Sequence, residues 1–107
     1  MAHETFHVPV EKLSDHTKRM HYAISSLMEE LEAVDWYYQR ADDTDDEELK
    51  AILLHNAHEE IEHAAMVLEW LRRSDRKFDE KLREYLFQKG SIVGREHEVE
   101  GKSGGAD

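Results

Sequence analysis

A glutamate and a histidine three positions apart are the residues of this sequence best suited to chemistry. Glu60 and His63 lie in a strongly helical stretch, and three residues are nearly one helical turn. Both side chains therefore project from one face of the expected helix and can bind one metal ion together. Because the sequence contains no cysteine, the ligands are oxygen and imidazole, which suit iron or manganese and are compatible with zinc.

A second carboxylate, Glu30, lies on the preceding helix at a matching level. In an antiparallel hairpin that turns near residue 44, Glu30 and Glu60 lie at similar distances from the turn. One chain then supplies one Glu and one Glu-x-x-His, which is half of the ligand set of a ferritin-like di-iron bundle. Two chains related by a twofold axis would supply the whole set. The alternative is that Glu60 and His63 lie at the solvated edge of a buried face.

Two other arrangements of histidine are weaker candidates. His58, Glu59 and His63 resemble a zinc-protease helix, but these histidines are five apart and point about 140° away from each other. They cannot bind one ion. His55 and His58 have a suitable spacing, yet a surface pair of this kind is most often simply solvated.

The first long helix carries two further groups. Glu29 and Glu32 form an acidic pair one turn apart, for which a solvated helix face is the simplest interpretation. Trp36, Tyr37 and Tyr38 follow one to two turns later and are most simply interface packing. A tyrosine beside a metal can also exchange a hydrogen bond with a bound ligand.

Helices are the elements that must position these residues. Apolar residues repeated every three or four positions predict helices at about residues 15–41 and 47–73, and a shorter one at about 76–88. The acidic run Asp42–Asp46 separates the first two, and so short a connection makes them antiparallel neighbours. Pro9 predicts an extended lead-in over the first dozen residues.

The apolar stripe of the second helix is interrupted at its centre. Its positions are Leu49, Leu53, Asn56, Glu60, His63, Val67 and Trp70. Burying an unpaired carboxylate costs on the order of several kcal/mol, so a carboxylate in this stripe is paired, protonated or metal-bound.

Composition limits the classes of function. The 107 residues form one small domain over 1–89, followed by a flexible Gly-rich tail over 90–107. The formal net charge of -11 argues against nucleic acid as a partner. The absence of cysteine excludes disulfides and cysteine catalysis. No apolar run resembles a signal peptide or a membrane span, so a cytoplasmic location is expected.

Longer strings of sequence resemble the encapsulated ferritin family over about residues 5–88. The strings that carry the resemblance are Ser26–Tyr37, His55–Asn56, Glu59–Met66, Leu68–Trp70 and Glu84–Phe87. His58 departs from an acidic residue of the family pattern, and Arg76 replaces a proline common at the start of the last helix. Neither departure involves the candidate ligands.

The resemblance implies an antiparallel two-helix hairpin with a short C-terminal helix, which dimerises into a ferritin-like four-helix bundle. It assigns Glu30, Glu60 and His63 to a di-iron centre shared by both subunits, with Tyr37 close by. Relatives of this kind assemble into a ring of five dimers inside an encapsulin nanocompartment.

The resemblance also implies an outer metal-uptake site. Glu29 and Glu32, with Trp36 adjacent, would bind calcium or another divalent cation there. Cargo of this kind ends in a short Gly-Ser-Leu-type docking peptide. The segment Gly90–Gly94 (GSIVG) is partly similar to such a peptide, but it does not lie at the C-terminus.

The resulting hypothesis is a ferroxidase that oxidises Fe(II) to Fe(III) and delivers iron for storage in the encapsulin shell. One alternative is a peroxide-reducing di-iron protein. Another is a non-catalytic helical assembly module whose acidic residues only bind cations.

Overall fold

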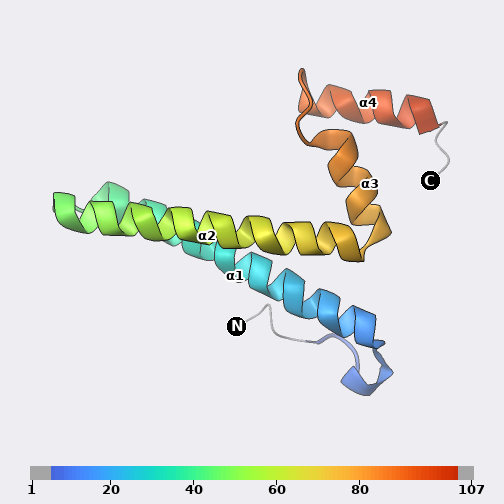
Figure 1. Cartoon of the computed structure of the whole chain (residues 1–107), viewed down its shortest axis with the longest axis horizontal. Helices are drawn as coiled ribbons and strands as arrows, with labels where there is room; N and C mark the ends of the chain where they lie inside the picture. Colours follow the sequence, from blue (N-terminus) through green and yellow to red (C-terminus); the bar gives the residue numbers. More distant parts are fainter. Residues whose placement is uncertain (1–5, 104–107) are drawn as a thin grey trace. The chain divides into compact units, whose positions relative to one another are not determined.

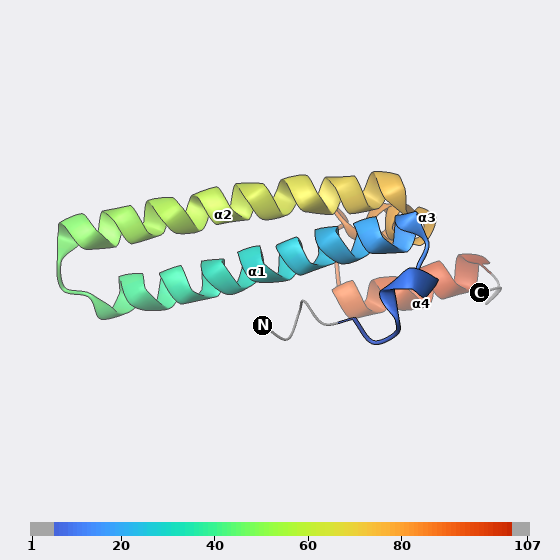
Figure 2. The same cartoon turned by 90° about the horizontal axis from the view of Figure 1, so that it is seen from below.

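Two long helices, α1 (Asp15–Asp43) and α2 (Glu47–Ser74), form an antiparallel hairpin. The computed structural model describes residues 6–103, and side chains are described as far as Glu100. α1 and α2 lie side by side over their length and are joined by one tight turn (Figures 1 and 2). The predicted hairpin is confirmed, and each helix extends to within two residues of the predicted ends.

Side-chain caps explain where the two helices begin. Ser14 Oγ accepts a hydrogen bond from the backbone N–H of Thr17 at 3.1 Å, which satisfies one of the unpaired donors at the start of α1. Asp46 Oδ1 does the same for Leu49 N at 3.0 Å at the start of α2. The acidic turn therefore ends one helix and begins the next.

The chain divides into two compact units, Met1–Leu71 and Arg72–Asp107. The second unit contains α3 (Arg76–Tyr85) and α4 (Ile92–Ser103). Asp75 caps α3 by accepting from Phe78 N at 2.9 Å. Arg95 Nε on α4 donates to the carbonyl oxygen of Glu84 on α3 at 2.7 Å, so a specific hydrogen bond ties these two short helices together.

The prediction that residues from 90 onward lack structure was wrong for the described part of that segment. α4 occupies Ile92–Ser103, with Ser91 Oγ accepting from Gly94 N at 2.9 Å at its start. The prediction relied on the glycine content of the segment and overlooked both the serine cap and the apolar Val99, which is 8% exposed. Residues 104–107 lie outside the described part.

Two smaller predictions also need correction. α3 ends at Tyr85 and not near residue 88, because Leu86 is extended and Phe87 has a φ of 62°, outside the helical range. The lead-in contains a short 3₁₀ helix, Val10–Lys12, after Pro9. Residues 1–5 of the lead-in lie outside the described part.

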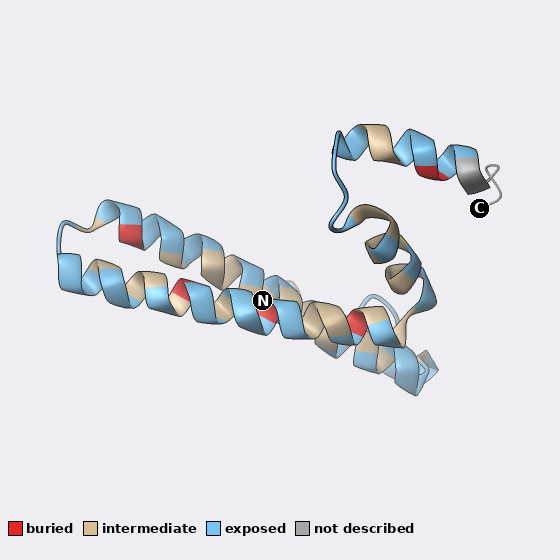
Figure 3. Cartoon of the chain, turned by 45° about the horizontal axis from the view of Figure 1, so that its top comes forward, coloured by how far each residue is buried: buried red, intermediate tan, exposed pale blue. Residues whose placement is uncertain are grey.

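Little of the described chain is buried. Only five apolar residues of the described segment are buried: Ala41, Ala57, Ala64, Leu71 and Val99 (Figure 3). Large apolar side chains on both long helices remain exposed instead, for example Leu31 at 53% and Ile52 at 54%. Two helices that pack only against each other leave part of their apolar surface exposed. Exposed apolar surface of this kind is typical of sites that contact another protein.

The fold class is all-α. The residues described include no strand. None of the described helices has the length and apolar character required to cross a membrane. Dimerisation into a four-helix bundle remains a prediction.

Candidate metal centre

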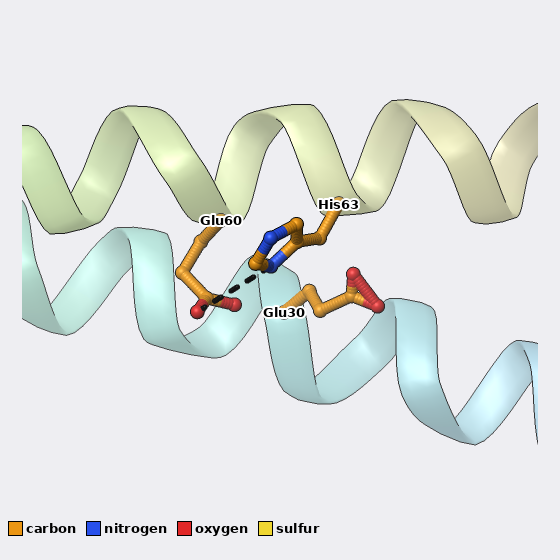
Figure 4. Close-up of side chains that lie close together, drawn as sticks. All are labelled: Glu30, Glu60 and His63. Atoms are coloured by element: carbon orange, nitrogen blue, oxygen red, sulfur yellow. Dashed lines mark ion pairs between the residues drawn. The ribbon is translucent and has the colours of Figure 1, made fainter.

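Glu30, Glu60 and His63 meet between the two long helices. Each offers one ligand atom, and these three atoms all lie within 4.8 Å of one another. Figure 4 shows the two α2 side chains pointing toward α1, with the Glu30 side chain of α1 beside them. Within the Glu-x-x-His pair, His63 Nδ1 lies 3.8 Å from Glu60 Oε1. The structure therefore brings together the three predicted ligands.

Small buried side chains allow α1 to approach α2 at this level. Ala57 lies three positions before Glu60 and is 0% exposed, and Ala64 lies four positions after it and is 8% exposed. On a helix these spacings place all three residues on one face. The alanines bring the backbones close, so that the longer Glu60 side chain extends into the space between the helices.

The electrostatics of Glu30 indicate a site that lacks positive charge. Its Oε2 atom is buried and has no hydrogen-bond partner in the described structure. Burial raises the pKa of Glu30 above its ordinary value, the negative charge of Glu60 raises it further, and His63 acts in the opposite direction. A carboxylate in this situation is stabilised by a cation.

A metal ion fits this donor set. Two carboxylates and one imidazole match the oxygen and nitrogen ligands of iron and manganese sites, and a cation would give the orphaned Glu30 oxygen a partner. Three ligands leave coordination positions for a second ligand set or for small molecules. His63 is 46% exposed at its side chain, so the cluster is reachable from outside the hairpin.

The other candidate residues lie outside this cluster. Among the described residues, the group able to hold a metal contains neither Glu29 nor Glu32, although the charge of Glu29 also raises the pKa of Glu30. Trp36 is 49% exposed, and Tyr37 is partly buried on the same helix. The roles predicted for these four residues remain predictions.

Arg40 was missed by sequence reasoning. Its guanidinium carbon lies 5.9 Å from the centre of the Trp36 ring and 5.7 Å from that of Tyr37. These distances are within the range of cation–π attraction. The i, i+3 and i, i+4 spacings were the available signal, but arginine near the end of a helix is usually attributed to the helix dipole.

The alternative histidine pair has an ordinary surface environment. His55 Nε2 lies 3.7 Å from Glu59 Oε1, and their side chains are 71% and 49% exposed. His58 is exposed as well. These histidines therefore fit the solvated interpretation.

Together, the all-helical hairpin and its carboxylate–histidine cluster define a ferritin-like arrangement. A model of the EncFtn-like family matches residues 5–89. The chain belongs to this encapsulated ferritin family, as its sequence had indicated.

Three similar proteins illustrate the relationship. An "Encapsulated ferritin-like protein" of Rhodospirillum rubrum is 56% identical over 94% of this chain and 73% of its own length. A "Ferritin-like protein" of Thermotoga maritima is 48% identical over 94% of this chain and 88% of its own. The crystal structure of protein ne0167 from Nitrosomonas europaea superposes with a TM-score of 0.79 at 57% identity, covering 81% of this chain and 96% of that one. The family supports a ferritin-like, iron-related protein.

Proposed function

We propose that this chain is a ferroxidase, with Fe(II) as its substrate and O2 as the electron acceptor. The observation that carries the proposal is the meeting of Glu30, Glu60 and His63 within 4.8 Å, with one Glu30 oxygen buried and unpartnered. Iron bound there would supply the redox chemistry. The two carboxylates favour Fe(III) over Fe(II) and so make the bound ion easier to oxidise.

The proposed centre is completed by a second copy of the chain. One hairpin offers three ligands, and a twofold axis beside the cluster would double them to four carboxylates and two imidazoles. The exposed apolar residues of both long helices support this, because they supply the surface that a four-helix bundle buries. We further propose that such dimers form a decameric ring.

Two neighbouring groups have proposed supporting roles. Tyr37 would lie beside the centre and exchange a hydrogen bond with a bound ligand. Glu29 and Glu32, with Trp36 adjacent, would form the outer uptake site for calcium or another divalent cation. Both roles rest on resemblance and on position along α1.

Storage of the product is assigned to a separate shell. A hairpin with this little buried surface cannot enclose a mineral, so the proposal places the protein in an encapsulin nanocompartment in the cytoplasm. Docking to the shell is proposed to use Gly90–Gly94. Within that segment Ile92 and Val93 are 79% and 72% exposed, which supports a contact role.

The deciding experiment adds Fe(II) anaerobically to the metal-free protein, then admits air and follows Fe(III) absorbance. Wild type should oxidise iron faster than buffer. The Glu60→Gln variant keeps the shape of the side chain but loses its charge, and it should fall to the buffer rate. Glu62→Gln is the matched control, because Glu62 is an exposed glutamate of the same helix outside the cluster.

The alternatives give different results in the same experiment. A peroxide-reducing protein would oxidise iron faster with H2O2 than with O2. A non-catalytic assembly module would leave Fe(II) at the background rate in every variant. Wild-type oxidation by the Glu60→Gln protein would overturn the proposed site.

A further inference from the structure

Four arginines line one hollow in the unit Arg72–Asp107. The hollow has a volume of about 380 Å³, and its charged lining consists of Arg72, Arg73, Arg76, Arg83, Asp75 and Asp79. The whole chain has only 14 lysines and arginines against 25 acidic residues. This local concentration of positive charge contrasts with the negative net charge of the protein and indicates an anionic ligand.

Both aspartates of the hollow already have structural partners. Asp79 Oδ1 accepts hydrogen bonds from Arg72 Nη1 and from Arg83 Nε, the second at 2.8 Å. Asp75 accepts from Phe78 N as the cap of α3. Hydrogen bonding to Arg72, above all, holds the pKa of Asp79 below its ordinary value, so this carboxylate is charged at neutral pH. With two negative and four positive charges, the lining has a formal charge of +2.

Two of the arginines retain donors for a ligand. Arg76 is exposed and makes no hydrogen bond or ion pair with any described residue. Arg83 bonds Asp79 through Nε alone, so its two terminal nitrogens lie outside that bond, and its side chain is 68% exposed. Asp79 thus holds Arg72 and Arg83 at one point of the rim, which fixes their charges in place before any ligand arrives.

We propose that this hollow binds a phosphate-type oxyanion, either inorganic phosphate or the phosphoryl group of a small phosphomonoester. Guanidinium groups present paired N–H donors that match the oxygens of such an anion. The size of the hollow suits a small ligand, whereas a nucleic acid or another large polyanion meets a chain with a net charge of -11. This site is separate in sequence from the metal cluster and does not depend on the proposed oxidation.

The test is calorimetric titration of the full-length, metal-free protein with inorganic phosphate, at an ionic strength held constant with potassium chloride. Wild type should bind phosphate, and Arg76→Gln and Arg83→Gln should each weaken binding about tenfold, as expected for one lost charge-assisted hydrogen bond. Arg19→Gln is the matched control, since it removes an exposed arginine of α1 outside the hollow and should bind as wild type does. Circular dichroism establishes that each variant keeps its helices.

Parallel titrations identify the source of the anion. Binding of both phosphate and glycerol 3-phosphate, or of either one alone with the same dependence on Arg76, supports the site. The proposal is overturned if phosphate gives no more heat than chloride, or if the Arg76 and Arg83 variants bind as tightly as wild type. Binding of poly-glutamate in the absence of phosphate binding would also overturn it and would identify an acidic protein surface as the partner.

Discussion

Glu30 of α1 and Glu60 of α2 bring two carboxylates into one cluster between the helices of the hairpin. Ligand atoms of the two residues lie within 4.8 Å of each other, and burial, followed by the charge of Glu60, raises the pKa of Glu30. Two carboxylates this close repel each other unless a proton or a cation lies between them. Without a cation, the cluster therefore destabilises the hairpin that carries it.

The first prediction is that Glu30→Gln stabilises the metal-free protein. The amide introduced by this substitution has no charge, and it can donate a hydrogen bond to Glu60 in place of the repulsion. We expect the Tm to rise by about 2–4 °C, since relief of one partly screened repulsion is worth less than the 1 kcal/mol that shifts Tm by about 4–8 °C in a small domain. Differential scanning calorimetry in the presence of a chelator measures this change.

Metal ions should reverse the order of stability. Fe(II) under anaerobic conditions should raise the Tm of wild type and leave that of Glu30→Gln nearly unchanged, because a ligand that binds only the folded state stabilises it.

The raised pKa of Glu30 also determines how the stability of the metal-free protein depends on pH. The folded state holds the proton of Glu30 more tightly than the unfolded chain does, so metal-free wild type should gain stability relative to Glu30→Gln as pH falls below neutrality. A metal-free Glu30→Gln protein that melts below wild type would contradict the proposed repulsion.

The second prediction concerns the apolar surface beside the cluster. Leu31 follows Glu30 directly and is 53% exposed in the single chain. If a second copy covers this surface, Leu31→Glu places a charge in the interface and should break the dimers, and any ring built from them, into monomers. Size-exclusion chromatography with light scattering measures the mass of each species.

Ile92→Glu is the control for the Leu31 variant. Ile92 is also apolar and is 79% exposed, but it belongs to α4 in the other unit. This control should leave the wild-type assembly intact, which separates the effect of position from the effect of added charge. A Leu31→Glu protein with the mass of wild type would exclude this face of α1 from the interface.

The hairpin and the meeting of the three residues of the candidate site could be predicted from sequence because periodicity and spacing determine them. An apolar step of three and four fixes which residues of a helix share a face, and the short turn between Asp43 and Glu47 fixes the register between α1 and α2. Glu30 and Glu60 therefore had to lie at one level. The buried Ala57 and Ala64, which set the distance between the helices, follow from the same period.

Other features depend on contacts between residues that sequence does not place together. Arg95 bonds the carbonyl oxygen of Glu84, eleven positions earlier, and no local pattern indicates that partner. The hollow of four arginines likewise depends on Asp79, which accepts hydrogen bonds from Arg72 seven positions before it and from Arg83 four positions after it. The high glycine content led to the wrong prediction of an unstructured tail. Composition is an average over the whole segment, whereas the Ser91 side chain caps α4 at a single position.

The third prediction tests that cap. Ser91→Ala removes the side-chain oxygen that accepts from Gly94 N and should destabilise α4 by about 1 kcal/mol. The amides of the first turn should exchange with solvent about five- to tenfold faster in hydrogen-exchange measurements, while those of α1 keep their rates. Ser91→Asp retains an acceptor at the cap and serves as the control. Equal exchange in all three proteins would show that the cap does not limit the stability of α4.

The fourth prediction concerns Asp79 and acid. Its pKa lies below the ordinary value of 3.8, mainly because Arg72 donates a hydrogen bond to the ionised form, with Arg83 adding to the effect. The unfolded chain therefore binds the Asp79 proton more readily than the folded chain does. It follows that the stabilisation is fully present above pH 3.8 and is lost as pH falls from there through the lower, folded pKa.

Asp79→Asn removes this contribution at every pH. The variant should unfold more readily than wild type at neutral pH, and the difference in Tm should shrink as the solution is acidified below pH 3.8. Asp35→Asn is a suitable control, because Asp35 accepts its hydrogen bond from the neutral side chain of Gln39 and has no arginine donor among the described contacts. A Tm difference for Asp79→Asn that stays constant through the acid range would mean that the two arginines do not lower the proton affinity of Asp79. In that case Asp79 would not fix the arginines of the hollow through its charge.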